Sequence, residues 1–350
     1  MIIKKWLPLQ RLAQVRIARG ILCNSEFKNV FPDFLRVHGL IDTQYKYRIL
    51  SSLDLPSVLR NPTMGIIQAL GIEIANWCLW HNVFLIDATL DYWNRIQWYS
   101  HGTINRLETA RALIQDENIN IGQRFNLACA YYLESDVRTL WKDMSLGYRY
   151  CFVTRKHEYK SRTFWLDALQ TGDPLDWSQI SGVINIENFF EHDTRNYFHR
   201  NDLGLLQLLP NLENPETRFR SILISIGNEA FHPFDLYLCL SKLEDHQLDK
   251  LFDCLSTEQR VSVCKSFLHW PLQGLFLEIF ERLRTNMSII SYIQLFVFFL
   301  CEKCNTKWSD YDYEDLVKRI WSSLPHDTKS LIRRSEIFIF LKKVLDNEGQ

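Results

Sequence analysis

The sequence contains few of the residues that interrupt regular structure, with 13 glycines and 10 prolines in 350 residues. Because both residues mark turns, their scarcity argues against many short strands and favours long helical segments. A long apolar run is also missing. The most apolar stretch, 289–301, is too short to cross a bilayer and is interrupted by Ser291 and Gln294. We therefore expect no transmembrane segment.

The chain has no excess of charge of either sign, since 40 basic and 41 acidic residues leave a net charge of -1. Nucleic-acid-binding proteins usually carry a basic face, so no nucleic-acid partner is expected. The nine cysteines, an odd number, are scattered and lie mostly in apolar segments. Such cysteines are typical of a reducing compartment rather than of a disulfide framework, and we expect a cytoplasmic protein.

The main pattern in the sequence is that of amphipathic helices. The stretch 121–144 is interpreted as two short helices that meet near Glu134, and Ser135 or Asp136 is expected to cap the second. Its apolar positions are 4, 4, 3, 1 and 3 residues apart, which is the spacing of one buried helical face. These positions are Cys129, Leu133, Val137, Leu140, Trp141 and Met144.

This apolar skeleton recurs later in the chain. The matching sets are Cys264, Leu268, Leu272, Leu275, Phe276 and Ile279; Cys239, Leu243, Leu248, Leu251, Phe252 and Leu255, with one inserted residue; and Val317, Ile320, Trp321 and Leu324. Amphipathic helices resemble one another, so chance recurrence is the alternative interpretation. The uneven spacing predicts an all-α fold made of an irregular, solenoid-like stack of antiparallel helical hairpins.

Turn-forming residues divide this predicted stack. Residues 171–174, with the sequence TGDP, form the clearest turn signal in the middle of the chain. We predict an N-terminal helical lobe over 1–170, a polar connection over 171–216 and a C-terminal helical lobe over 217–350, with one continuous domain as the alternative. Pro62 is expected to begin a helix. Asn214 and Pro215 are expected to cap and begin another.

With these hairpins, the chain resembles α-helical repeat proteins in general, such as ankyrin-like, armadillo-like or tetratricopeptide-like arrays. The ankyrin pattern TPLHxA and the tetratricopeptide small-residue pattern are both missing. Residues 124–141, RFNLACAYYLESDVRTLW, also resemble a block of uncharacterised arthropod proteins that occur in large expanded families. The resemblance implies a helical fold and no particular activity.

The densest polar cluster lies in 187–202, but no nucleophile motif, glycine-rich phosphate loop or metal-spaced histidine pair accompanies it. We therefore predict no catalytic residue, and a solvated polar stretch is the preferred interpretation. If the chain is an enzyme, this cluster would supply acid–base groups or bind an anion. The residues concerned are Glu191, His192, Asp193, Arg195 and His199.

Two further segments each allow a functional interpretation beside the structural one. Cys301 and Cys304 form a single CxxC, a weak metal candidate because zinc needs four ligands and no second pair follows; no cofactor is predicted. Residues 145–170 interleave basic residues with Tyr148 and Tyr150, a pattern that can hold nucleic acid but is more typical of a solvated helix face.

The first 22 residues are basic and amphipathic, with no acid before Glu26. They are interpreted as a helix lying on the core, and the alternative is a segment that targets the protein or attaches it to a membrane surface.

The sequence thus favours a non-enzymatic intracellular scaffold or protein–protein interaction module, because stacked hairpins offer a groove for a peptide or partner helix. The partner's identity and the oligomeric state do not follow from the sequence. The alternatives are a hydrolase or other enzyme that uses 187–202, and a peripheral membrane protein with a basic N-terminal helix.

Overall fold

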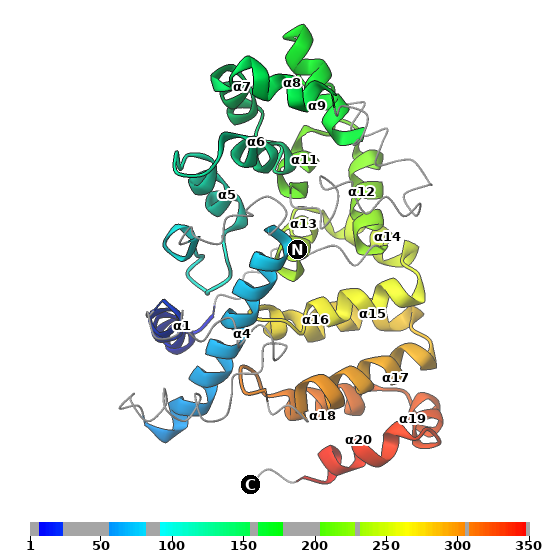
Figure 1. Cartoon of the computed structure of the whole chain (residues 1–350). Coiled ribbons are helices and arrows are strands. Elements are labelled where there is room, and N and C mark those ends of the chain that lie inside the picture. The colour runs from blue at the N-terminus through cyan, green and yellow to red at the C-terminus, as the bar shows by residue number, and fades with distance from the viewer. Residues whose placement is uncertain are drawn as a thin grey trace. The chain divides into compact units, whose positions relative to one another are not determined.

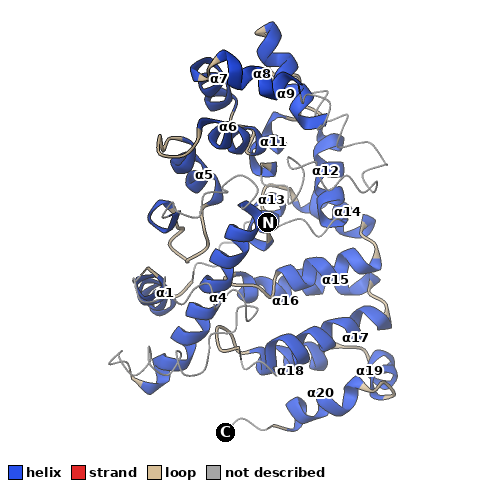
Figure 2. Ribbon diagram, in the orientation of Figure 1, coloured by secondary structure: helices blue, strands red, loops and turns tan. Residues whose placement is uncertain are grey.

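The computed structural model describes residues 7–23, 56–81, 92–154, 160–177, 204–227, 232–304 and 308–347. These residues form α-helices, short 3-10 helices and one π-helix joined by loops, without a β-strand, as Figure 2 shows. An isolated bridge between Trp98 and Ile104 is the nearest approach to strand pairing in this part of the chain. The prediction of an all-α fold is confirmed.

The chain divides by contacts into two compact units. Unit 1 comprises Met1–Ala75, Ser100–Thr103 and Leu240–Gln350, and unit 2 comprises Asn76–Tyr99 and Ile104–Cys239. Each unit therefore combines segments that are far apart in the sequence. The bounds of these units differ from those of the predicted lobes over 1–170 and 217–350. The lobes and the polar connection at 171–216, much of which lies outside the described residues, stay predictions.

Unit 1 contains α1 and most of α4, together with the helices from α14 onward (Figure 1). The element bounds are α1 Leu9–Leu22, α4 Ser57–His81, α14 Asp245–Cys254, α15 Thr257–Ser266, η3 Leu272–Leu275, α16 Phe276–Leu283, η4 Arg284–Asn286, α17 Ile289–Phe298, the π-helix η5 Phe299–Cys304, α18 Tyr313–Ser323, α19 His326–Arg333 and α20 Ile337–Asp346.

Helices of unit 1 pack on near neighbours in the sequence. α14 contacts α16, α15 contacts α16 and α17, and α20 contacts α17 and α18. Aromatic side chains fill the space between them, namely Phe267, Phe276, Phe280, Phe296 and Phe299, each fully buried. Large flat rings of this kind contribute much of the apolar burial that holds helices together.

Unit 2 contains the end of α4 and the helices up to α13. Its further elements are η1 Tyr92–Arg95, α5 Arg106–Ile114, α6 Ile121–Ala130, α7 Glu134–Asp143, α8 Leu146–Thr154, α9 Lys160–Thr171, α11 Leu205–Asn211, α12 Pro215–Gly227 and α13 Pro233–Leu240. α5 packs on α6, and α6 packs on α7 through a turn in which Tyr132 adopts a positive φ of 54°.

Two predicted helix starts are wrong. Pro62 lies inside α4 rather than at its first residue, and Thr63 bonds back to the carbonyl of Leu59. The helix therefore begins at Ser57, before the proline, whose missing N–H interrupts the bonding ladder. α7 begins at Glu134, so Ser135 and Asp136 lie in its first turn, and the capping position belongs to Leu133, which offers no side-chain cap.

The predicted start at Pro215 is confirmed, since α12 begins there and Asn214 Oδ1 accepts a hydrogen bond from the Glu216 N–H at 2.9 Å. A short carboxamide satisfies one of the unpaired N–H groups of the first turn. In α1, Val15, Ala18 and Leu22 are buried while Arg16 is exposed. The helix thus lies on the core through these apolar residues, with Arg16 on its outer face and Arg11 and Arg19 half-buried.

None of the helices in the described ranges combines the length and apolar character needed to span a membrane.

Candidate functional site

The polar residues named as catalytic candidates, Glu191, His192, Asp193, Arg195 and His199, lie outside the described residues. Cys301 and Cys304 lie in the π-helix η5, the first exposed and the second half-buried, and both are free thiols. Within the described ranges, no group of three or more His, Cys, Asp or Glu side chains is arranged to hold a metal ion.

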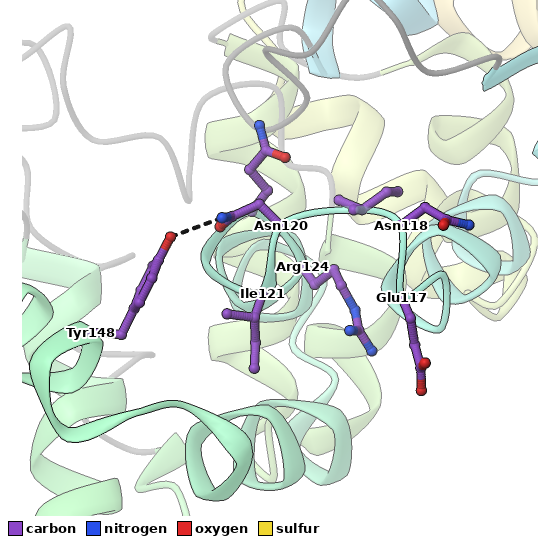
Figure 3. A pocket seen from close by; sticks show the side chains of 8 residues that line it. Glu117, Asn118, Asn120, Ile121, Arg124 and Tyr148 are labelled. Atoms are coloured by element: carbon purple, nitrogen blue, oxygen red, sulfur yellow. Dashed lines mark hydrogen bonds between the residues drawn. The ribbon is translucent and has the colours of Figure 1, made fainter.

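A pocket of about 670 Å³ opens in unit 2 at the connection between α5 and α6 (Figure 3). Its lining comes from the segment 117–124, without Gly122, and from Tyr148 of α8. Most of the side chains from this segment are polar, namely Glu117, Asn118, Asn120, Gln123 and Arg124, and the others are Ile119 and Ile121. Carboxamides both donate and accept hydrogen bonds, so this lining can pair with the N–H and C=O groups of a bound chain.

Asn120 is the residue that organises the pocket wall. Its Oδ1 accepts a hydrogen bond from the Gly122 N–H at 2.8 Å and so caps α6. Its Nδ2 donates to Tyr148 Oη at 2.8 Å, the contact drawn in Figure 3. One side chain thus joins the start of α6 to α8. Arg124, on the first turns of α6, donates through Nε to the carbonyl of Ile114, which ties α6 to the end of α5.

α8 has two faces with different surroundings. On one face, the rings of Phe152 and Phe125 are 5.0 Å apart, and the guanidinium of Arg149 lies over the ring of Trp141 at 5.7 Å. On the other face, Leu146 and Tyr150 are 81% and 69% exposed. These two residues are four apart and therefore share one side of the helix, so α8 presents an apolar stripe to solvent. Tyr148, which lines the pocket, lies two residues from each of them and therefore on the opposite side of the helix.

A buried polar network lies elsewhere in unit 2. His81 Nδ1 lies 2.7 Å from the carbonyl of Trp77, and Nε2 lies 2.7 Å from Tyr131 Oη. This geometry assigns the ring proton to Nδ1 and leaves Nε2 to accept from the Tyr131 hydroxyl. Burial lowers the pKa of His81 to about 3, so the imidazole is neutral at pH 7 and acts as a fixed connector.

Arg106, the first residue of α5, is the buried cation of this region. Its Nη1 lies 3.2 Å from Asp235 Oδ2, and its guanidinium stacks 4.3 Å from the Trp80 ring centre. Two other nitrogens, Nε and Nη2, are buried without a hydrogen-bond partner. The ion pair joins α5 to α13 within the unit, and its depth suits a structural role.

Unit 1 holds a second buried pair of ionisable groups. Asp310 Oδ2 accepts from Gln273 Nε2 at 2.7 Å and from Tyr313 Oη at 3.3 Å. Burial raises the pKa of Asp310 to about 6, an effect that the positive charge of Lys303 opposes. Lys303 itself is buried, with its ammonium 4.3 Å from the ring centre of Trp308 and 5.3 Å from that of Tyr313. Burial lowers the pKa of Lys303.

Sequence reasoning missed the pocket, because residues 116–120 resemble an ordinary polar break between helices. The available signal was the amide-rich segment Asn118–Gln123, followed by the tyrosines of α8. Only the fold places Tyr148, 28 residues further on, against Asn120.

No protein-family model matches the chain, and comparisons with curated proteins and with solved structures give no match either.

Proposed function

We propose that this chain is a non-enzymatic protein-interaction module that binds an extended segment of a partner protein along α8 and in the neighbouring pocket. The observation that carries the proposal is the exposure of Leu146 and Tyr150 on one side of α8, a helix that also contributes Tyr148 to a mainly polar pocket. Apolar anchors supply affinity to a peptide site, and amides that pair with its backbone supply orientation.

The internal packing of α8 supports this role. Tyr148, Arg149 and Phe152 hold the helix through contacts with Asn120, Trp141 and Phe125. The exposed face therefore belongs to a helix that three side-chain contacts join to its neighbours, although none of its own residues is buried. A preformed surface lowers the entropic cost of association.

The wider architecture that we propose is an irregular stack of antiparallel hairpins. In unit 1, contacts between alternate helices, α14 with α16 and α15 with α17, support this arrangement because hairpins that stack bring alternate helices together. We further propose an intracellular location on account of the nine free thiols, of which Cys129, Cys239 and Cys264 are buried in the helical core.

A peptide-display selection on the full-length protein tests the proposal. Selected peptides are expected to bind wild type and to lose at least about tenfold in affinity with the double change Leu146→Ser, Tyr150→Ser, since both apolar anchors disappear. The matched control is Ile290→Ser, which alters an apolar residue of unit 1 that is 61% exposed. Binding that survives the double change, or a selection that yields no binder, would contradict the proposal.

A further inference from the structure

The last helix of unit 1, α20, has an outer face that is exposed, with Ile339, Phe340, Lys342 and Lys343 all open to solvent. Its inner face, with Leu341 and Val344, is buried, and the helix contacts α17, α18 and α19. It lies at the margin of the unit in Figure 1. On the outer face, Ile339 and Phe340 are 65% and 52% exposed, although both are large apolar residues.

Two charged residues flank this apolar pair symmetrically. Glu336, Ile339, Phe340 and Lys343 are all exposed and are separated by three, one and three residues, which places them on one side of the helix. The acid thus lies about one turn before the apolar pair, and the lysine about one turn after it. The Lys343 ammonium lies 5.6 Å from the ring centre of Phe340, so this side chain extends over the apolar pair.

This order of residues is complementary to itself. If a second copy of α20 lies antiparallel across a two-fold axis between Ile339 and Phe340, each Glu336 faces a Lys343 of the other copy. The same axis brings each Ile339 against a Phe340. A two-fold interface requires that one surface match itself in this way, with every contact made twice.

We propose that the outer face of α20 binds a second copy of this chain, as an antiparallel pair of helices around Ile339 and Phe340. Self-association buries four apolar side chains and forms two ion pairs. An acidic peptide or an anionic membrane would pair with Lys342 and Lys343, but would place negative charge beside Glu336. The presence of both signs in mirrored positions therefore favours a second copy over an anionic partner.

Sedimentation velocity over about a hundredfold range of protein concentration tests the pairing on the full-length chain. Wild type is expected to show a monomer–dimer equilibrium. Ile339→Asp should weaken it on the order of a hundredfold, because the centre of the interface becomes charged twice. Ile290→Asp, which changes an apolar residue of α17 that is 61% exposed, should leave it unchanged. Circular dichroism of each variant checks that these surface changes leave the helices folded.

Two charge reversals test the antiparallel register. Glu336→Lys alone sets two positive charges against each other at both ends of the interface, and Lys343→Glu alone sets two negative charges there. Each variant should dimerise roughly tenfold more weakly than wild type. Mixed together, the two variants should form heterodimers of about wild-type affinity, because every acid again faces a lysine.

A monomeric wild type at every concentration would overturn the proposal, as would a dimer that Ile339→Asp leaves intact. A dimer that the mixture does not restore would overturn the register. Binding of monomeric wild type to vesicles of anionic lipid, lost with Ile339→Asp, would assign the face to a membrane surface and would equally overturn pairing with a second copy. None of these outcomes depends on α8, so the peptide-binding proposal is tested separately.

Discussion

At the scale of single residues, the buried Arg106–Asp235 pair offers a direct test of how unit 2 is held together. Arg106→Met keeps an unbranched apolar side chain but removes the guanidinium that lies over Trp80 and leaves the Asp235 carboxylate without its cation. Removing one partner of a buried pair typically costs about 3–5 kcal/mol. We expect a loss of this order in the free energy of unfolding, measured by urea denaturation.

The double change Arg106→Met, Asp235→Leu distinguishes the cost of an unpaired charge from the cost of losing the arginine's other contacts. Because it removes both charges, it should be clearly more stable than Arg106→Met alone, and equal effects in the two variants would argue against an unpaired charge as the cause. The exposed pair Arg111–Glu108 serves as a control, since Glu108→Gln should cost less than about 0.5 kcal/mol.

Asp310 predicts a specific pH dependence. Burial raises its pKa from 3.8 to about 6, against the positive charges of Lys303 and Arg11 and the hydrogen bond from Tyr313. The folded state therefore retains the proton to higher pH than the unfolded state. Retaining this proton contributes up to about 3 kcal/mol to the free energy of unfolding. The contribution is fully present below about pH 4 and is lost as the pH rises through 6.

The variant Asp310→Asn keeps an acceptor for Gln273 and cannot ionise, so its stability relative to wild type should increase as the pH rises from 4 to 7. Urea denaturation across this pH range measures the difference. The same substitution at the exposed Asp327 is measured alongside as a control for replacing an aspartate by asparagine on the surface. If the curve for Asp310→Asn runs parallel to that of wild type, the Asp310 carboxyl does not retain its proton on folding.

At the scale of elements, α4 depends on a glycine for close packing. A Cβ atom on Gly65 would collide with the backbone of Ser309 and Asp310, whereas a Cβ on Gly20 of α1 would meet nothing within 4 Å. Gly65→Ala should therefore destabilise the protein by at least about 2 kcal/mol, because the backbone must move. Gly20→Ala should stabilise it by roughly 0.5–1 kcal/mol through reduced chain entropy.

The comparison between these two substitutions is made by thermal or urea unfolding. The side chain is the same in both variants, so opposite signs isolate the effect of packing from that of helix propensity. Tolerance of Gly65→Ala, with a stability at or above that of wild type, would contradict the close approach of α4 to the segment at Ser309.

Apolar periodicity predicted most of the residues that face the core, although Leu243 and Trp321, from the other two sets, are only half-buried. All six positions of the skeleton in α6 and α7 are buried, and so are the six that begin at Cys264. Helix starts were less predictable, because the signals compete. Pro62 resembles a first residue but is accommodated inside α4, and Ser135 resembles a cap but follows the start of α7. Whether the recurring skeleton reflects true repeats stays a prediction.

At the scale of the whole molecule, the contacts that define the units lie beyond the reach of sequence patterns. Ser309 donates to the carbonyl of Asn61, and Trp270 donates through Nε1 to the carbonyl of His101. Each bond joins segments more than 150 residues apart, and no local spacing specifies such a pairing. The candidate surface on α8 was equally hidden, since exposure depends on which neighbours a helix acquires in the fold.

Self-association through α20 would also make the stability of the whole molecule depend on concentration. A dimer that forms only from folded chains stabilises the folded state by mass action, so the thermal midpoint of wild type should rise as the protein concentration increases. Ile339→Asp should show a much smaller rise, because its pairing is weaker on the order of a hundredfold. Differential scanning calorimetry at low and high concentration measures this, and a midpoint that rises equally in both proteins would place the association on another surface.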